Sequence, residues 1–533
     1  MLLTSHGPIS LQREVRVEFS DHVRWALQYH DRRFRRHETF PFLAFGISQR
    51  RQALNSARVQ MRRKDFDKDA HMMSTITLQK LDQASREEES HTSISDPAVQ
   101  RLRKHIHATS GHVMGSDQSR YQLRSQIWST SIVLGPPALW ITINPTDLHD
   151  PIAQVFVGED IDLDNFSGEM GPDANKRAQN IAADPYAAAK FFHFIIGVIL
   201  TDLFGVHVTK YQVHSEMGVL GEVSAYFGTV ESQGRGTLHL HLLIWLKNTP
   251  NADQMMDMLK SSSFRDKILA YIRANLRSYL PGLDNQQSVN AISVQKTIAY
   301  NRPPKPDVEG YERELSQFEL KLARSEQVHT CQVRRCLFPD KDGRYRCKRR
   351  APFPTFEEDF VDENGNWGSK RLYEYINGWI PAILINVRCN NDGKLLTNGK
   401  DTRNVSFYTT LYSSKKQNRY NNISAIMAKG YAYHLEQIAL NSKVSDYVDE
   451  LRDTQRLLIF RLVHAINREQ ELAAPMVISY LMGWGDTYRS HHYTPIYWSS
   501  FVGLLMKKFP VLRMSIRRVV LLKIFRWSLI WKQ

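Results

Sequence analysis

Residues 237–245 (Thr-Leu-His-Leu-His-Leu-Leu-Ile-Trp) constrain the fold more than any other segment. The stretch is strongly apolar apart from its two histidines, and it has the composition of a buried β-strand. Side chains alternate between the two faces of a strand, so His239 and His241 project from the same face, about 6–7 Å apart along the backbone. The segment therefore predicts a sheet that presents two neighbouring imidazoles.

These two imidazoles are candidate metal ligands. Burying them in an apolar strand without partners is costly. The preceding residues 234–236 (Gly-Arg-Gly) favour a turn that brings Glu231 or Gln233 back toward His239 and His241. Two histidines and one oxygen ligand would leave open coordination positions, as in catalytic metal sites. The alternative is a hydrogen-bonded or solvent-facing histidine pair, which a His-x-His tripeptide alone does not exclude.

Composition indicates a polyanionic partner and a reducing compartment. The chain has 70 Lys and Arg against 55 Asp and Glu, a formal net charge of +15. Such a surplus is typical of nucleic-acid-binding proteins. Only four cysteines argue against a secreted disulfide scaffold. The sequence shows no signal peptide, and residues 191–204 are too short for a membrane span and predict a buried helix. No membrane partner is expected.

The order of segments predicts an α+β protein with several domains, because strands and helices are mixed in the central part. Residues 85–97 are polar and acidic, and we expect them to be a linker. The expected parts are a basic, partly disordered arm (1–115), a sheet-containing core (116–300), a Cys/His insertion (301–360), a tyrosine-containing region (361–440) and a helical C-terminal region (441–533).

A second metal site is predicted by four soft or borderline ligands within nineteen residues. His329, Cys331, Cys336 and Cys347 follow the spacing His-x-Cys-x4-Cys-x10-Cys, which uses three of the four cysteines. This pattern favours a closed, structural Zn²⁺ site, and unpaired core thiols are the alternative. Neighbouring basic residues would then be presented to DNA phosphates on a metal-bound loop. They are Arg344, Arg346, Lys348, Arg349 and Arg350.

A tyrosine pair forms the third candidate group. Tyr408 and Tyr412 would lie on one face of a helix, with about 5–6 Å between their Cβ atoms, and Lys415 and Lys416 follow. Taken alone, this spacing is more typical of half-buried packing than of catalysis.

Residues 226–241 (Tyr-Phe-Gly-Thr-Val-Glu-Ser-Gln-Gly-Arg-Gly-Thr-Leu-His-Leu-His) resemble the His-hydrophobic-His, or HUH, motif of Helitron transposases. These enzymes are similar to rolling-circle replication initiators, which cut one DNA strand with a tyrosine. The family places a Glu, a Gln and an Arg-Gly ahead of the two histidines. Residues 144–149 (Asn-Pro-Thr-Asp-Leu-His) resemble the family's first motif, and the Tyr-x-x-x-Tyr pair resembles its nucleophile motif.

The resemblance implies an HUH-type antiparallel sheet with flanking helices, in which residues 361–440 complete the nuclease. It implies Mg²⁺ or Mn²⁺ on His239, His241 and Glu231, with Gln233 as the alternative third ligand. Tyr408 and Tyr412 would be the nucleophiles. Lys415 and Lys416 would favour the phenolate form, and Arg235 would contact DNA.

The implied reaction is the nicking and joining of single-stranded DNA at transposon ends through a 5′-phosphotyrosine, in the nucleus. Family members usually continue into a helicase, but no Gly-x4-Gly-Lys-[Ser/Thr] motif occurs here. We therefore expect a transposase fragment with a truncated or divergent tail, whose helicase domain is missing from this chain. A catalytically inactive DNA-binding protein and a metal hydrolase that uses water as nucleophile remain alternatives.

Overall fold

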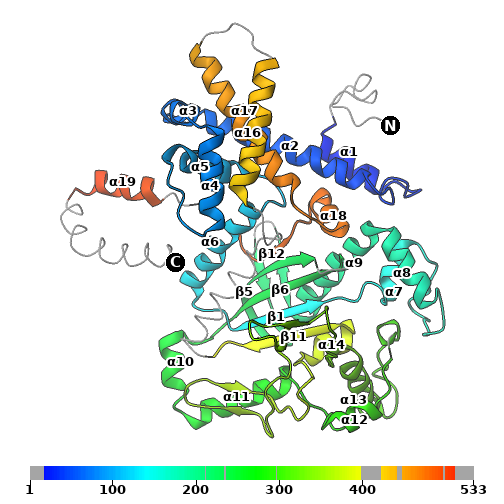
Figure 1. Cartoon of the computed structure of the whole chain (residues 1–533). Coiled ribbons are helices and arrows are strands. Elements are labelled where there is room, and N and C mark those ends of the chain that lie inside the picture. The colour runs from blue at the N-terminus through cyan, green and yellow to red at the C-terminus, as the bar shows by residue number, and fades with distance from the viewer. Residues whose placement is uncertain are drawn as a thin grey trace. The chain divides into compact units, whose positions relative to one another are not determined.

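The computed structural model describes residues 17–209, 212–232, 236–295, 297–397, 422–440, 447–495 and 498–510. The chain divides into two compact units, residues 1–490 and 491–533. The first unit holds an antiparallel sheet and three groups of helices (Figure 1). Within the second unit, the described secondary structure is one helix, α19 (Trp498–Lys508).

A curled antiparallel sheet lies at the centre of the first unit. Its strands run in the order β11-β1-β6-β5-β12, and short β4 pairs with β5 at the side. The α+β expectation is confirmed as a mixed helix and sheet architecture. The strands are β1 (Leu139–Asn144), β4 (Met217–Gly218), β5 (Gly221–Ser232), β6 (Leu238–Leu246), β11 (Asn390–Leu395) and β12 (Thr487–Arg489).

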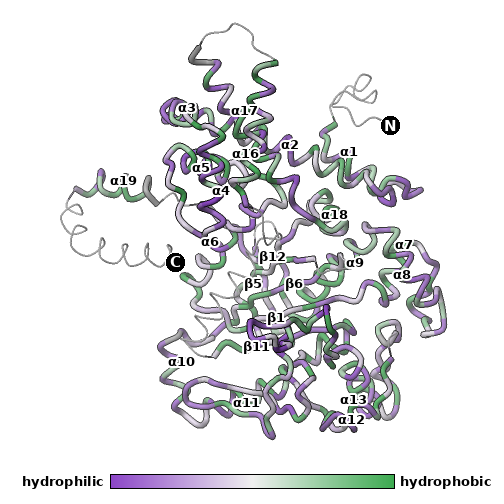
Figure 2. The backbone as a smooth tube through the Cα atoms, in the orientation of Figure 1, coloured by the Kyte–Doolittle hydropathy of each residue, from purple (hydrophilic) through white to green (hydrophobic). Residues whose placement is uncertain are grey.

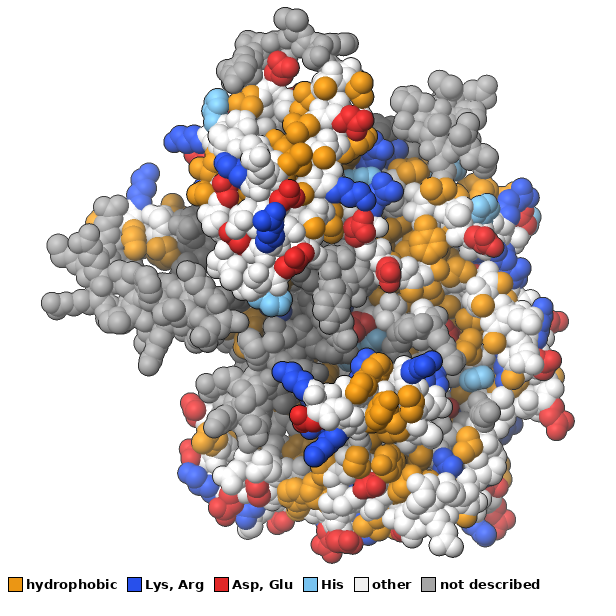
Figure 3. Space-filling model, in the orientation of Figure 1, with side chains coloured by type: hydrophobic (Ala, Val, Ile, Leu, Met, Phe, Trp, Pro, Cys, Tyr) orange, Lys and Arg blue, Asp and Glu red, His pale blue; other side chains and the backbone are white. Residues whose placement is uncertain are grey.

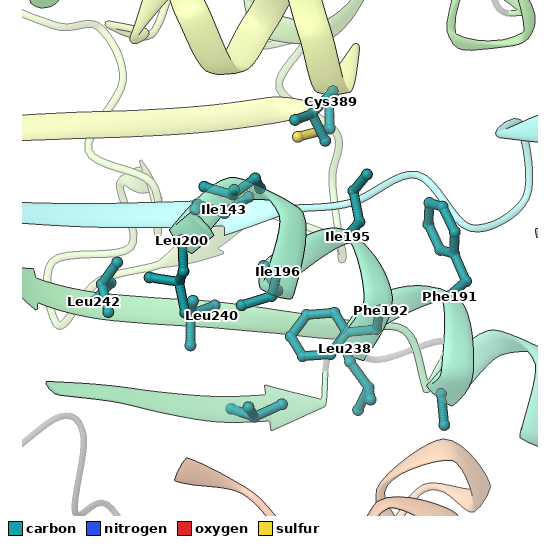
Figure 4. Close-up of a cluster of buried hydrophobic side chains, with 14 of the residues drawn as sticks. Ile143, Phe191, Phe192, Ile195, Ile196, Leu200, Leu238, Leu240, Leu242 and Cys389 are labelled. Carbon is teal, nitrogen blue, oxygen red and sulfur yellow. The ribbon is translucent and has the colours of Figure 1, made fainter. Parts of the chain in front are cut away.

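Leucines and histidines alternate along β6, so they project from opposite faces of the sheet. Leu238, Leu240 and Leu242 belong to the largest hydrophobic core, together with Ile143 of β1. These side chains gather beside α9 (Pro185–Val198) and its π-helical extension η1 (Ile199–Leu203), as Figure 4 shows. His239 and His241 lie between these leucines in sequence and so project from the other face. The sheet therefore has one apolar face and one face that carries the histidines.

The predicted buried helix at residues 191–204 is confirmed by the burial of Phe191, Phe192 and Ile196 in this core. By length and composition, the combined helix Pro185–Leu203 is also long and apolar enough to cross a membrane. More than half of it is buried inside the protein, as in the core helix of a soluble domain.

The N-terminal helices form a second packed layer with two helices from near the C-terminal end of the unit. They share a separate hydrophobic core that includes Phe66, Leu102, Met427 and Leu462. Hydrophobic and hydrophilic residues alternate along these helices (Figure 2). The layer consists of α2 (Phe40–Met61), α3 (Phe66–Ser74), α4 (Leu78–Glu89), α5 (Pro97–Ser110), α16 (Ile423–Leu440) and α17 (Tyr447–Arg468).

This layer differs from the partly disordered arm expected for residues 1–115, of which residues 17–115 are described. The expected linker at 85–97 contains the end of α4 and the beginning of α5. Its polar residues have structural partners: Glu88 binds Arg103 at 2.7 Å and accepts a hydrogen bond from Ser424 at 2.7 Å, and Asp96 caps α5. The polar composition therefore reflects capping and ion pairing instead of disorder.

The C-terminal region also differs from the expected separate helical part. Strand β12 extends the central sheet, and α18 (Ala474–Met482) packs on α9 and α2. Helix α1 (Phe19–Leu27) packs on α18 in turn. The described residues 447–490 therefore belong to the same compact unit as the sheet.

The remaining helices lie around the sheet and near its β11 edge, where a third small core includes Leu322, Ile376 and Trp379. Helix α14 leads directly into β11. The helices are α6 (Asp117–Leu134), α7 (Pro151–Val157), α8 (Ala174–Ala183), α10 (Ala252–Met258), α11 (Ser262–Asn275), α12 (Gln286–Ala291), η2 (Ile298–Tyr300), α13 (Tyr311–Leu322), η3 (Ala323–Gln327) and α14 (Pro381–Val387). Three small hairpins complete the unit, β2 (Val206–Val208) with β3 (Val213–Ser215), β7 (Leu337–Pro339) with β8 (Tyr345–Cys347), and β9 (Phe360–Val361) with β10 (Trp367–Gly368).

Candidate metal centres

The β5–β6 hairpin brings Glu231 to the histidine pair. Glu231 is directly opposite His239 in the register, so their side chains share one face. Its Oε2 atom lies 3.7 Å from His239 Nε2 and 3.9 Å from His241 Nε2. One ligand atom from each of the three residues lies within 4.8 Å of the others. A carboxylate and two imidazoles thus converge at this position, as the sequence predicted.

Thr142 of the neighbouring strand orients one of these rings. It lies opposite His241 in the β1–β6 register, and its Oγ1 is 3.1 Å from His241 Nδ1. Contact through Nδ1 leaves His241 Nε2 facing Glu231. Fixing one ring nitrogen so that the other can bind metal is common around metal-binding histidines. The sheet register therefore orients the pair as well as placing it.

Both imidazoles are neutral near pH 7. Burial lowers the pKa of His239 to about 4 and that of His241 to about 3. Arg120 adds a smaller repulsive effect on both rings. Because a metal ion binds the neutral form of imidazole, these residues need lose no proton before binding one. The donor set and its protonation state fit a divalent cation.

Arg120 of α6 connects this site to a buried ionic network. Its Nη2 lies 3.9 Å from Glu231 Oε1, the carboxylate oxygen that does not face the histidines. Its Nη1 donates to Val230 O and to Asp486 Oδ2, both at 3.1 Å. Tyr480 also donates to Asp486 Oδ2, at 2.8 Å. Burial opposes the Arg120 charge, but the acidic neighbours outweigh this effect and raise its pKa.

Sequence reasoning missed Arg120, Asp486 and Thr142. They come from a helix, the loop before β12 and a neighbouring strand, and no local motif links them. A single arginine in a helix of mixed composition gives no local signal of such a role. The structure adds these three residues as the outer contacts of the Glu231–His239–His241 group.

The Cys/His residues form a second cluster around the β7–β8 hairpin. One ligand atom from each of His329, Cys331, Cys336 and Cys347 lies within 4.8 Å of the others. His329 Nε2 is 3.2 Å from Cys347 Sγ, and the Gln332 backbone N–H donates to Cys336 Sγ at 3.2 Å. All four cysteines of the chain are free thiols. Three sulfurs and one imidazole in this arrangement could bind a metal such as zinc.

The thiol environments in this cluster differ. Burial and the neighbouring thiols raise the pKa of Cys331 to about 11. Burial also opposes ionisation of Cys347, but the backbone N–H groups of Arg349 and Ala351 outweigh it and lower the Cys347 pKa. A metal cation would favour the thiolate form at every cysteine ligand. Without a metal, the pKa values of Cys331 and Cys347 are shifted in opposite directions.

The five predicted basic residues of this region are exposed on the hairpin and the turn after it. Arg346 pairs with Asp340 at 2.6 Å, and Lys348 Nζ lies 3.5 Å from the Phe338 ring centroid. The structure thus places Arg344, Arg346, Lys348, Arg349 and Arg350 beside the Cys/His cluster.

The first-motif residue Asp147 is buried, which raises its pKa to about 6. Six predicted site residues lie outside the described residues, and their placement stays a prediction. They are Gln233, Arg235, Tyr408, Tyr412, Lys415 and Lys416.

Residues 22–244 match a known family, the Helitron helicase-like domain at N-terminus. The match begins in α1 and ends in β6, so it includes all three residues of the Glu231–His239–His241 group. It supports the presence of a Helitron helicase-like transposase N-terminal region, a transposase-related function and interaction with DNA. The Cys/His cluster and the tyrosine pair lie beyond the matched residues. No curated protein matches the chain.

Proposed function

We propose that this Helitron-related chain is a metal-dependent endonuclease that cuts and rejoins single-stranded DNA through a 5′-phosphotyrosine. The observation that carries the proposal is the convergence of Glu231, His239 and His241 on one sheet face, within the family-matched segment. Three ligands of this type, one of them anionic, suit a hard or borderline divalent cation with open coordination positions. Such an ion beside a phosphodiester would activate it for strand transfer.

The residues of the chain divide the chemistry among them. A Mg²⁺ or Mn²⁺ ion in the Glu231–His239–His241 group would polarise the scissile phosphate and offset its developing negative charge. The neutral imidazoles leave the carboxylate of Glu231 as the anionic ligand. Arg120 holds this carboxylate from behind, with its charge 3.9 Å from Oε1.

The nucleophile is the hydroxyl oxygen of Tyr408 or Tyr412. Its attack forms a phosphorus–oxygen bond and breaks the bond to the 3′ oxygen, which leaves with a proton as a free 3′-hydroxyl. Phenols ionise only near pH 10, so the nucleophile needs a nearby positive charge that favours the phenolate. Lys415 and Lys416 supply this charge. Two tyrosines allow two covalent linkages, one for each strand end that is exchanged. Reversal of the step by a new 3′-hydroxyl rejoins the strand without a ligase.

The Cys/His cluster has a different role in this proposal. Four soft or borderline ligands leave no open position, so Zn²⁺ would hold the β7–β8 hairpin and its exposed basic residues in place. These residues would then contact the phosphates of the strand, including those near transposon ends. Cleavage depends on the first group, and hairpin stability on the second.

The test is covalent capture of a labelled single-stranded oligonucleotide in the presence of Mn²⁺. We expect a protein–DNA adduct that survives denaturation, disappears in the Tyr408→Phe/Tyr412→Phe variant and requires Glu231. Glu222→Gln, at the other end of β5, is the matched control and should keep the adduct. Glu231→Ala should lower nicking more than Gln233→Ala. The opposite order would identify Gln233 as the third ligand.

Two results would replace the proposal with its alternatives. Cleavage without an adduct, unaffected by either tyrosine, identifies a metal hydrolase that uses water. Binding of the oligonucleotide without cleavage, with Mn²⁺ bound, identifies an inactive DNA-binding protein.

A further inference from the structure

A cavity of about 360 Å³ opens at the β11 edge of the sheet. It is bounded by the segment after α11, by β10 and by β11. Its walls combine the aromatic rings of Phe356 and Trp367 with the polar side chains of Ser278, Arg371 and Asp392. This volume is at the lower end of the range for small-molecule sites. The cavity therefore has the size and the mixed lining of a site for one small aromatic group.

The polar groups of the cavity offer a donor and an acceptor side by side. Arg371 donates to Ser278 Oγ at 3.2 Å and to Pro354 O at 2.9 Å, while its buried Nε has no hydrogen-bond partner. Ser278 Oγ is also 2.7 Å from Ser369 Oγ. Burial raises the pKa of Asp392, and the charges of Lys394 and Arg371 oppose this shift. An unpaired buried donor is costly, so it favours an incoming acceptor.

Asp392, which lines the cavity, projects from the same sheet face as the Glu231–His239–His241 group. Thr142 lies opposite His241 on one side and opposite Asp392 on the other. Residues opposite each other in antiparallel strands project from the same face. Two strand spacings separate His241 from Asp392, about 10 Å. That separation corresponds to about three nucleotides of a stacked strand, and fewer of an extended one.

A cation–aromatic pair lies between the two sites. Lys394 lines the cavity and is opposite Trp140 in the register, with Nζ 5.4 Å from the Trp140 ring centroid. Trp140 is itself beside His241, with 6.3 Å between ring centroids. A lysine and an aromatic ring are the kinds of group that hold a single-stranded backbone and its bases.

We propose that this cavity binds one unstacked nucleobase of the single strand, a few nucleotides from the scissile phosphate. The inference rests on the proposed function for its DNA substrate. Phe356 and Trp367 provide apolar walls for the ring, and Arg371 and Asp392 bind its acceptor and donor groups. The cavity thereby sets which phosphate reaches the metal ligands.

The experiment measures binding of the full chain to a single-stranded oligonucleotide in EDTA, where no cleavage occurs. A series of oligonucleotides carries one abasic nucleotide, moved one position at a time. We expect one position at which the abasic nucleotide weakens binding about tenfold. Asp392→Asn should weaken binding of the intact oligonucleotide by a similar factor and remove the additional loss at that position, because both changes delete the same contact.

Two further variants keep the result interpretable. Ser369→Leu fills the cavity without changing a charge, and it should remove the same position dependence while thermal unfolding shows a folded protein. Glu363→Gln changes an exposed carboxylate in the β9–β10 turn outside the cavity, and it should keep the wild-type pattern. Equal losses at every abasic position, or a position-specific loss that persists in both cavity variants, would overturn the proposal. A position-specific loss without adduct formation would retain the base site and reject the endonuclease.

Discussion

At the residue scale, the three candidate metal ligands lie close together in the sequence, whereas the residues that contact them come from distant segments. Glu231, His239 and His241 lie within eleven residues, and strand alternation together with the β5–β6 pairing is enough to bring them together. Thr142 and Arg120 come from segments about a hundred residues earlier in the chain, and Asp486 from much later. Their positions depend on strand order and helix packing, which a single sequence does not specify. The proximity of the three candidate ligands was therefore predictable, whereas the positions of Thr142, Arg120 and Asp486 were not.

Arg120→Lys should weaken Mn²⁺ binding while leaving all three ligands in place. The guanidinium reaches Glu231, Asp486 and the Val230 carbonyl together, whereas a single ammonium cannot satisfy this planar set. Loss of an outer interaction of this type costs about 10–100-fold in metal affinity. Calorimetric titration with Mn²⁺ measures the effect.

Arg388→Lys is the matched control for Arg120→Lys. Arg388 forms a buried ion pair with Asp150 at 3.0 Å, away from the histidines. The control should lower stability and leave Mn²⁺ affinity unchanged. Equal weakening of Mn²⁺ binding in both variants would show that Arg120 acts through general stability alone.

At the element scale, the β7–β8 hairpin is short, and its exposed residues bury little apolar surface. Its strands have three residues each, Cys336 directly precedes β7 and Cys347 is the last residue of β8. We predict about one zinc per chain in the wild type and none in Cys347→Ser, because a closed tetrahedral site needs all four ligands. The variant hairpin should also become sensitive to limited proteolysis.

Cys389→Ala is the control for the zinc measurement. Cys389 is the fourth cysteine, fully buried beside β11 and outside the Cys/His cluster. Metal analysis should find the same zinc content as in the wild type. Zinc loss in Cys389→Ala, or full retention in Cys347→Ser, would contradict the ligand assignment.

The packing of α9 against α18 and β12 gives the first unit an acid-sensitive element. His193 of α9 lies between Tyr488 Oη at 2.5 Å and Ser479 Oγ at 2.9 Å, and burial lowers its pKa to about 3. Below pH 6.5, His193 is protonated in the unfolded chain but stays neutral in the folded chain. The free energy of unfolding therefore falls as pH falls from 6.5 toward 3. Between pH 6.5 and 5, His193 alone lowers the free energy of unfolding by about 2 kcal/mol.

His193→Gln should reduce that acid-induced loss of stability, because glutamine keeps a hydrogen-bonding side chain that does not titrate. Urea unfolding at pH 7 and pH 5 measures the difference. His71→Gln, an exposed substitution in α3, should show the same loss as the wild type. An unchanged pH dependence in His193→Gln would place the acid-sensitive group elsewhere.

Prediction of the elements themselves succeeded where apolar periodicity was strong and failed where polar residues had structural partners. Helix α9 and strand β6 were recognised from their apolar runs. The polar residues 85–97 were interpreted as a linker, although Glu88 and Asp96 in that segment form ion pairs and a helix cap. Caps, surface ion pairs and linkers use the same residue types, so composition alone does not separate them.

At the scale of the whole molecule, the central sheet and the N-terminal helical layer are each built from segments that lie far apart in the sequence. Strands β11 and β12 form the two edges of the sheet, although more than ninety residues of chain separate them. Helices α16 and α17 complete the core of the N-terminal helices. An α+β class could be predicted from mixed strands and helices, but not these pairings, because many strand orders satisfy the same hydrophobic pattern. The expected domain boundary after residue 440 lies between α16 and α17, which share one core.

The net charge of +15 predicts salt-dependent DNA binding by the whole chain, and the structure shows how to assign it. Lys and Arg side chains are spread over the face in Figure 3, among Asp and Glu. Total charge therefore does not locate the DNA path. We predict that the triple variant Arg344→Gln/Lys348→Gln/Arg349→Gln reduces the slope of log affinity against log salt by about 2, or about 0.7 for each phosphate that is no longer neutralised.

A control variant that removes the same charge from another surface distinguishes DNA contact at the hairpin from an effect of overall charge. Arg58→Gln/Arg62→Gln/Arg63→Gln changes three exposed arginines at the end of α2 and in the turn after it. Fluorescence anisotropy of a single-stranded oligonucleotide, titrated at several salt concentrations, gives both slopes. If the strand follows the β7–β8 hairpin, only the first triple variant lowers the slope. Equal reductions would mean that binding depends on overall charge, and a reduction in the α2 variant alone would place the DNA path on the helical layer.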